Sequence, residues 1–467
     1  MTAKKYCVND AIEAVGFGRF QIILSFCTGL SWMADSMEIM LLSMLSPALV
    51  CEWGISPYQQ ALGTTCVFIG WMVFSPIWGW FCDRFGRKTG LFFANLMGGI
   101  FGVATAFAPS FTFFVIARGC VGMAMGGVPQ SATLYAEFLP TAHRAKCIIL
   151  LELFWAMGSA FEALLALIIM PIWGWRALVV ASSMPLFLFT LCCIWIPESP
   201  RFLVSHHKTE RAGDVLQRIA KCNKAKLPEG VLVPDFEPGE GSNKTITALL
   251  SKGLRMTTLL LWVIWMMNAF SYYGMSLYTT KLFQSTDTCH GGSPHNGISV
   301  NNSTSTENPC IPLRGNDYLD ILATSFSEVP GLLLTMLIIE RIGRRLTIGL
   351  QFFVFALANY VLYFCLSRNI IVCILFVARA LIAGAFQATY VYTPEVYPTT
   401  VRALAIGTAS MFARIGAMVT PYVAQVIANY NIVYATLIYG TSGIIGALCS
   451  ILLPIETAGR EMTEIYH

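Results

Sequence analysis

Long apolar runs alternate with short polar segments along the whole chain of 467 residues. A helix that crosses the hydrocarbon core of a bilayer needs about 20 apolar residues. Twelve runs reach that length, at 20–50, 59–82, 89–108, 111–135, 147–171, 176–196, 256–281, 317–339, 346–366, 370–393, 403–428 and 432–454. The first run is too long for a cleaved signal peptide and contains two acids, so we expect it to remain as a helix. The pattern predicts an all-α membrane protein with twelve transmembrane helices.

The scarcity of charge supports this fold class. Charged residues make up 12% of the chain and hydrophobic residues 56%, whereas a soluble domain has about 25% charged residues. This excludes a disordered chain and a protein that binds nucleic acid through a basic surface. The sequence contains no phosphate-binding loop, zinc-protease motif or recognisable catalytic triad, so we expect no enzyme activity, cofactor or metal site.

Lysine and arginine residues are concentrated in alternate loops, which indicates the orientation in the membrane. Cytosolic loops of membrane proteins carry an excess of these residues. If both termini are cytosolic, the cytosolic segments hold 23 of the 30 lysines and arginines, the external segments four and the spans three. The sequence therefore predicts a multi-pass protein with both termini in the cytosol.

The loop 282–316 is external in this orientation, and its motifs fit that side. Asn301 and Asn302 each begin a glycosylation sequon. Cys289 and Cys310 in the same loop are candidates for a disulfide, for which Cys51 at the outer end of the first span could compete. We predict a glycosylated external or lumenal loop.

Motifs of the first half recur in the second half at an offset of 257 or 258 residues. Asp83-Arg-Phe-Gly-Arg-Lys returns as Glu340-Arg-Ile-Gly-Arg-Arg, Glu137-Phe-Leu-Pro returns as Glu395-Val-Tyr-Pro, and Pro197-Glu-Ser-Pro-Arg returns near Pro454-Ile-Glu-Thr. An internal repeat of this kind predicts two similar units. We expect six-helix bundles at 20–196 and 256–454, a cytosolic linker with short helices at 197–255, and cytosolic ends at 1–19 and 455–467.

These repeated loops resemble those of the major facilitator transporters, near the sugar and organic-ion branches. The runs at 32–38, 127–137, 268–274 and 392–397 resemble the synaptic vesicle 2-related group of that superfamily. The resemblance implies two pseudo-symmetric bundles around a central cavity and a location in synaptic or secretory vesicle membranes, with the plasma membrane as the alternative. Ala458 departs from it, because the closing motif of the family usually has lysine there.

Ionisable residues inside the predicted spans are candidates for function, because each is costly in a bilayer unless it is paired or hydrated. Asp35 in the first span and Arg118 in the fourth lie at nearly the same predicted depth. A pair that loosens as the site opens would let Asp35 bind a proton, as the resemblance to proton-linked sugar porters also implies; a static ion pair is the alternative. Glu38, one turn further out, either adds negative potential to the outer mouth or is a hydrated vestibule residue.

Glu328 in the eighth span and Arg414 in the eleventh both lie near the middle of the membrane. Arg414 is similar to the arginine with which organic-anion transporters hold their substrate, and permanent neutralisation by Glu328 is the alternative. Arg379 has no acid at matching depth. The resemblance further places Asn268, Tyr272, Tyr273, Gln387 and Tyr390 in the cavity, although the tyrosines fit packing or interfacial positions equally well. The sign of the substrate charge stays open.

Acidic and basic residues at the cytosolic ends of the spans form two matching sets. The first is Asp83, Arg87, Glu137, Arg144, Glu198 and Arg201, and the second is Glu340, Arg344, Glu395, Arg402 and Glu456. Single pairs near water contribute only about 0–1 kcal/mol each, but a network can bias an equilibrium. We expect the two sets to close the cytosolic side in one state and to separate in the other.

The sequence thus predicts a monomeric secondary-active or facilitative transporter of a small organic ion, with protons as a further candidate partner. Gly119, Gly122, Gly126 and Gly127 indicate close helix packing in the fourth span rather than a phosphate loop, because no strand precedes them. The alternative is a vesicle glycoprotein, scaffold or nucleotide-binding regulator that has the transporter fold but does not transport.

Overall fold

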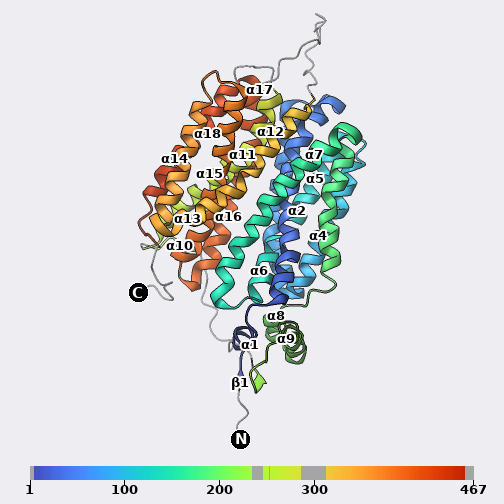
Figure 1. The fold of residues 1–467 in the computed structure, drawn as a ribbon, viewed down its shortest axis with the longest axis vertical. Helices are drawn as coiled ribbons and strands as arrows, with labels where there is room; N and C mark the ends of the chain where they lie inside the picture. Colours follow the sequence, from blue (N-terminus) through green and yellow to red (C-terminus); the bar gives the residue numbers. More distant parts are fainter. Residues whose placement is uncertain (1–4, 234–245, 252, 285–311, 458–467) are drawn as a thin grey trace, which may run out of the picture.

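The computed structural model describes residues 5–233, 246–251, 253–284 and 312–457, most of them in helices (Figure 1). The first half contains α1 (Val8–Val15), α2 (Arg19–Trp53), α3 (Pro57–Phe85), α4 (Arg87–Ala106), α5 (Phe111–Met125), α6 (Pro129–Glu137) and α7 (Thr141–Cys192). Between the halves lie α8 (Pro200–Ser205), α9 (Thr209–Asn223) and α10 (Ile246–Leu249). The strands β1 (Lys5–Tyr6) and β2 (Val231–Leu232) pair in parallel.

The second half repeats the pattern of the first. It contains α11 (Arg255–Gln284), α12 (Gly315–Phe326), α13 (Glu328–Ile342), α14 (Arg344–Val361), α15 (Arg368–Val396), α16 (Thr399–Pro421), the π-helix η2 (Tyr422–Ile427), α17 (Ala428–Tyr430) and α18 (Ile432–Ile451). In Figure 1 its helices, coloured yellow to red, lie to one side of the blue and green helices of the first half. We call the end of the molecule that carries α9 the α9 end, and the opposite end the α17 end.

The number of membrane-crossing helices agrees with the sequence. In the described part of the chain, nine helical segments are long and apolar enough to cross a membrane. One of them, Leu150–Cys192, contains Gly174 at φ +74°, a left-handed conformation that separates two crossing helices. The more polar α11 and α14 are 30 and 18 residues long. The predicted fold class, twelve helices in two similar bundles, is confirmed.

Local sequence signals explain where several helices begin. Ser56 precedes α3 and accepts a hydrogen bond from the backbone N–H of Gln59, whose side chain accepts one from the Ser56 N–H in return. Pro57 occupies the first helical position, where a missing N–H costs nothing. Ser110 caps α5 and Ser199 caps α8 in the same way, by accepting from a backbone N–H three residues later.

A small substructure at the α9 end packs against the first half. The apolar faces of α1, α8 and α9 share one core that includes Val8, Ile12 and Leu216. Glu13 of α1 accepts hydrogen bonds from the side-chain hydroxyl and the backbone N–H of Thr141, which hold the pKa of Glu13 below its ordinary value. The carboxylate of Glu13 therefore stays ionised at neutral pH and ties α1 to the start of α7.

Close packing of α3 on α5 depends on Gly122. A Cβ atom at Gly122 would overlap the backbone of Val67, whereas one at Gly119, a turn earlier, would meet nothing within 4 Å. We therefore expect Gly122→Ala to lower the free energy of unfolding by about 1–3 kcal/mol through overpacking. Gly119→Ala is the matched control and should unfold at the wild-type temperature or slightly above it. Thermal unfolding in detergent measures both, and equal loss in the two variants would contradict the packing role.

Candidate functional site

A cavity of about 550 Å³ lies between the two halves, and its wall contains aromatic side chains and four charged groups. The first half contributes Trp32, Asp35, Trp71, Glu152 and Trp155 among others, and the second half contributes Trp265, Tyr272, Tyr273, Glu328, Phe386, Gln387, Tyr390 and Arg414. Ligand sites of this volume with aromatic walls and few polar groups are typical for small organic molecules. The cavity is therefore the candidate functional site.

The cavity reaches toward the α9 end of the molecule. Ala136 at the end of α6 and Pro394 near the end of α15 belong to its wall. One contact between the halves is a hydrogen bond of 3.2 Å from Thr65 Oγ1 of the first half to the Met418 carbonyl of the second. The hydrogen bonds and ion pairs described for the polar sets at the α9 end, in contrast, stay within one half. The described polar contacts at the α9 end therefore do not join the two halves there.

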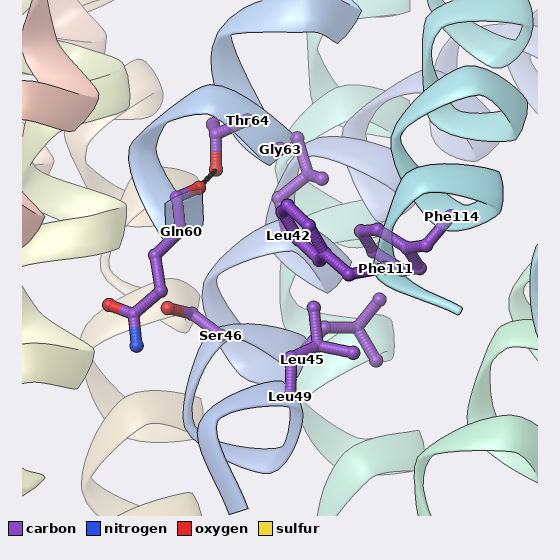
Figure 2. Close-up of a pocket in the computed structure, with 9 residues that line it drawn as sticks. All are labelled: Leu42, Leu45, Ser46, Leu49, Gln60, Gly63, Thr64, Phe111 and Phe114. Atoms are coloured by element: carbon purple, nitrogen blue, oxygen red, sulfur yellow. Dashed lines mark hydrogen bonds between the residues drawn. The ribbon is translucent and has the colours of Figure 1, made fainter. Parts of the chain in front are cut away.

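A second hollow between α2, α3 and α5 is too small for an organic ligand. Figure 2 shows its wall, in which Leu42, Leu45 and Phe114 lie opposite the polar Gln60 and Thr64. Its volume is about 10 Å³, the room of a single water molecule. Ser46 on the same wall accepts a hydrogen bond from the side-chain amide of Gln425 in η2, with 3.5 Å between Oγ and Nε2. The residues that line this hollow all belong to the first half, and Ser46 links its wall to the second half.

Arg414 holds the two halves together across the cavity. Its guanidinium carbon lies 3.4 Å from the centre of the Trp71 ring, and its Nη1 donates to the Tyr273 hydroxyl at 3.2 Å. The Tyr273 ring also packs against Phe68 of α3, with ring centres 5.0 Å apart. An indole face attracts a cation by about 0.5–2 kcal/mol. The guanidinium of Arg414 is therefore already held by side chains of the protein, Trp71 and Tyr273.

The expected pair of Asp35 and Arg118 is wrong. Nη2 of Arg118 lies 2.8 Å from Oε2 of Glu38, and both side chains are at most 1% exposed. Asp35 borders the cavity instead, and its Oδ1 has no hydrogen-bond partner among the residues described. Asp35 and Glu38 are one helical turn, about 5 Å, apart, and a depth counted from span ends is no more accurate than that.

The alternative in which Glu328 neutralises Arg414 is also contradicted. Oε1 of Glu328 lies 2.8 Å from Nε of Arg379, the arginine for which the sequence suggested no acid. The helices explain this choice, because α13 packs against α15, which carries Arg379. Tyr272 donates to the other oxygen of Glu328 at 2.8 Å, and Trp155 of the first half donates to the Tyr272 hydroxyl at 2.7 Å. A buried ion pair is thus linked to the opposite half.

Two acids in α7 escaped the sequence analysis. Glu152 belongs to the cavity wall, and no salt bridge is described for it. Glu162 is fully buried and contacts Ser182. Both lie within the predicted span 147–171, so the signal was an ionisable residue in an apolar run. The cavity tryptophans Trp71 and Trp155 were missed as well, because a tryptophan in a span is equally common in packing.

The remaining cavity candidates divide into two groups. Gln387 and Tyr390 of α15 belong to the wall as expected. Asn268 does not, and its expected place in the cavity is wrong. Its side-chain amide donates to Thr389 Oγ1 at 2.9 Å and is fully buried, so it joins α11 to α15. A residue count along α11 identifies the middle of the span but not which side faces the cavity.

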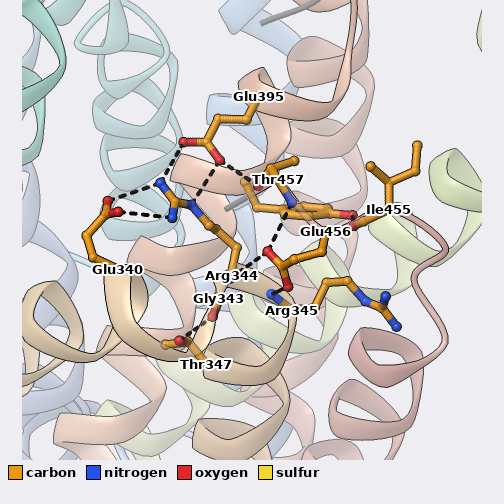
Figure 3. A network of polar contacts seen from close by, with 10 residues as sticks. Glu340, Gly343, Arg344, Arg345, Thr347, Glu395, Ile455, Glu456 and Thr457 are labelled. Carbon is orange, nitrogen blue, oxygen red and sulfur yellow. Dashed lines mark hydrogen bonds and ion pairs between the residues drawn. The ribbon is translucent and has the colours of Figure 1, made fainter. Parts of the chain in front are cut away.

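The polar set of the second half forms one connected network at the α9 end (Figure 3). Arg344 lies 3.0 Å from Glu340 and 3.1 Å from Glu395. Glu456 accepts hydrogen bonds from the backbone N–H groups of Arg344 and Arg345 at 2.9 and 3.1 Å. Its carboxylate therefore compensates the positive end of α14. Arg402 is not part of the network and donates to the Tyr397 carbonyl.

The first half repeats this network in a looser form. Arg87 lies 2.7 Å from Asp83 and 3.6 Å from Glu137. Glu198 accepts from the backbone N–H of Lys88 at 3.1 Å, as Glu456 does at α14. Two residues of the predicted first-half set contact other groups instead. Arg144 donates to the Leu139 carbonyl, and Arg201 donates to the side chain of Asn9 in α1.

Several predicted features of the external loop lie outside the described residues. These are the sequons at Asn301 and Asn302 and the disulfide of Cys289 with Cys310. Within the described part, Cys51 at the end of α2 and Cys365 before α15 are each disulfide-bonded.

Known families match both halves of the chain. The model described as Sugar (and other) transporter matches residues 26–290, and that of the Major Facilitator Superfamily matches residues 320–463. The svop-1 protein of Caenorhabditis elegans is 53% identical over 461 residues, which cover 99% of this chain and 87% of that relative. The synaptic vesicle 2-related protein of Xenopus laevis is 47% identical over 466 residues, 100% of this chain and 84% of the relative.

A solved structure has the same fold at low sequence identity. The inward-open conformation of the xylose transporter XylE from E. coli superimposes with a TM-score of 0.71 and 15% identity. The match covers 95% of this chain and 98% of that one. At this identity the likeness concerns the fold alone.

Proposed function

The chain belongs to the major facilitator superfamily, in the synaptic vesicle 2-related group, and from this premise we propose that it carries a small organic cation across a membrane by alternating access. The observation that carries the proposal is Glu152, an acid on the wall of the cavity for which no salt bridge is described. A cation in the cavity would supply the positive charge that this carboxyl lacks.

The balance of charge in the cavity supports a cation rather than an anion. Glu328 is neutralised by Arg379, and Arg414 is held by Trp71 and Tyr273. Asp35 and Glu152 then face a single positive group, Arg414. An anion would add to this excess of negative charge in a low-dielectric site, whereas a cation reduces it.

The aromatic wall favours the same class of ligand. Trp32 and Trp155 lie edge to face with ring centres 5.9 Å apart and belong to the same cavity wall as Glu152. Trp265 and Tyr390 form a similar pair on the opposite half, with centres 4.5 Å apart. Aromatic faces attract organic ammonium groups by about 0.5–2 kcal/mol each, which adds to the attraction of a carboxylate.

The proposal of alternating access rests on the two similar halves and on the polar sets at their α9 ends. We place the α9 end in the cytosol, because the loops there carry most of the lysines and arginines. The cavity then faces the cytosol in this state, and the two polar sets at the α9 end would meet when the halves rock to the outward-facing state. The names of the relatives support a vesicle membrane as the location.

Competition for the cavity carboxylates provides a basis for coupling to protons. Asp35 borders the cavity with an oxygen that has no described hydrogen-bond partner, so a proton and an organic cation can compete for it. Occupancy by one excludes the other on electrostatic grounds. We therefore propose exchange of the cation for protons.

Ligand-induced stabilisation of the purified protein tests the charge preference. A ligand at 100 times its dissociation constant stabilises the folded state by about 2.7 kcal/mol. We expect tetraethylammonium to raise the unfolding temperature, whereas benzoate and xylose leave it unchanged. A rise with benzoate or xylose but not with tetraethylammonium would refute the proposal.

A further inference from the structure

Glu162 of α7 lies in the interior of the first half, away from the cavity wall. Its two carboxyl oxygens are 2.7 and 2.8 Å from Oγ of Ser182, in the part of α7 that follows Gly174. The same hydroxyl lies 2.8 Å from the carbonyl oxygen of Leu178. A serine hydroxyl has one hydrogen to donate. If Ser182 donates to Leu178, a protonated Glu162 must donate to Ser182.

Among the described residues, no salt bridge to Glu162 is found. Glu38 of α2 and Arg118 of α5 are the charged residues that interact with it electrostatically. Beyond Lys88, α4 carries no titratable residue, and on α12 the acids Asp317 and Asp320 are paired with Arg368. Arg118 pairs with Glu38 and also interacts electrostatically with Glu162, and all three side chains are at most 1% exposed. A second carboxylate in this interior would be a buried charge without a partner of its own.

We propose that Glu162 is a proton-binding site of the first half, which exchanges its proton with Glu38 across Arg118. The donors Nε and Nη1 of Arg118 have no hydrogen-bond partner among the described residues, so the guanidinium can serve either acid. In the exchange, the O–H bond of Glu162 breaks and one forms on Glu38. The carboxylate of Glu162 then takes over the ion pair with Arg118, and the total charge of the interior does not change.

The exchange connects this interior to the cavity. Glu38 and Asp35 lie one turn apart on α2 and border the same void of about 10 Å³, while Asp35 also belongs to the cavity wall. A proton can thus pass from Glu162 to Glu38, then to Asp35 and to the water of the cavity. This role in coupling rests on the proposed exchange of a cation for protons, whereas the protonation of Glu162 does not.

Infrared spectroscopy of the membrane-reconstituted protein detects the proton directly. At neutral pH we expect the wild type to show the carbonyl band of a protonated carboxylic acid that is missing in Glu162→Gln and present in the control Glu210→Gln, an exposed residue of α9. Ser182→Ala should shift this band, because it removes the hydroxyl that lies within hydrogen-bond distance of the acid. Identical bands in wild type, Glu162→Gln and Ser182→Ala would overturn the site.

Transport in proteoliposomes tests the exchange separately. We expect Glu162→Gln to lose tetraethylammonium uptake driven by a pH gradient while it retains exchange of tetraethylammonium at equal pH. Uptake with wild-type pH dependence, despite loss of the band, would overturn the exchange with Glu38. If the wild type itself moves no cation but the band depends on Glu162, the proposed function fails and the proton site stands.

Discussion

Arg379→Ala is expected to lower the free energy of unfolding by about 3–5 kcal/mol, one of the two largest effects in the molecule. The substitution leaves Glu328 as a buried carboxylate that has lost the guanidinium 2.8 Å away. Removal of one partner of a buried pair costs more than the pair contributes, because the remaining charge is neither solvated nor neutralised. Denaturant titration of the detergent-solubilised protein measures the loss.

Two further variants distinguish this cause from a general loss of packing. Glu328→Gln combined with Arg379→Met removes both charges and keeps an acceptor for Tyr272, so it should recover most of the lost stability. Arg176→Ala is the matched control at the partly exposed pair with Glu52, where we expect a loss of about 0–1 kcal/mol. Equal losses at Arg379 and Arg176 would show that the buried pair carries no special cost.

Glu152→Gln is expected to weaken the binding of tetraethylammonium by about 30-fold or more. This factor corresponds to about 2 kcal/mol, the lower end of the cost of removing one partner from a buried charge pair. Glutamine keeps the size of the side chain and the aromatic wall around it, so the loss isolates the charge. Calorimetric titration of the purified protein measures the affinity.

The control for this prediction is Glu210→Gln, which removes an acid from the exposed face of α9. Its affinity should equal that of the wild type. Unchanged affinity in Glu152→Gln would mean that the ligand binds elsewhere or that another acid carries its charge, and would contradict the assignment of the site.

The fold could be predicted from the sequence because each helix that crosses a membrane requires a long apolar stretch of the chain. Apolar runs of about 20 residues reveal each crossing helix independently of the others. The repeat of Asp83-Arg-Phe-Gly-Arg-Lys at Glu340 indicated two similar halves, and the resemblance of these motifs to the major facilitator transporters is confirmed by the family matches. None of these inferences requires knowledge of which side of a helix faces which neighbour.

The ion pairs could not be predicted, because they depend on helix rotation and on differences of a single turn. Asp35 and Glu38 are equally plausible partners for Arg118 by depth, and only the rotation of α2, which packs mainly on α7, selects Glu38. Arg379 and Arg414 likewise differ in which neighbour their helix faces. A residue count along a span locates a charge in depth but contains no information about its direction.

The most direct test of the account is uptake of tetraethylammonium by proteoliposomes that contain the purified protein and an acidic interior. The wild type should accumulate the cation as protons leave, and accumulation should stop when the pH gradient is removed. Glu152→Gln should accumulate little under either condition. Absence of uptake by the wild type under a gradient of either direction, or equal uptake by wild type and Glu152→Gln, would contradict transport of a cation through this cavity.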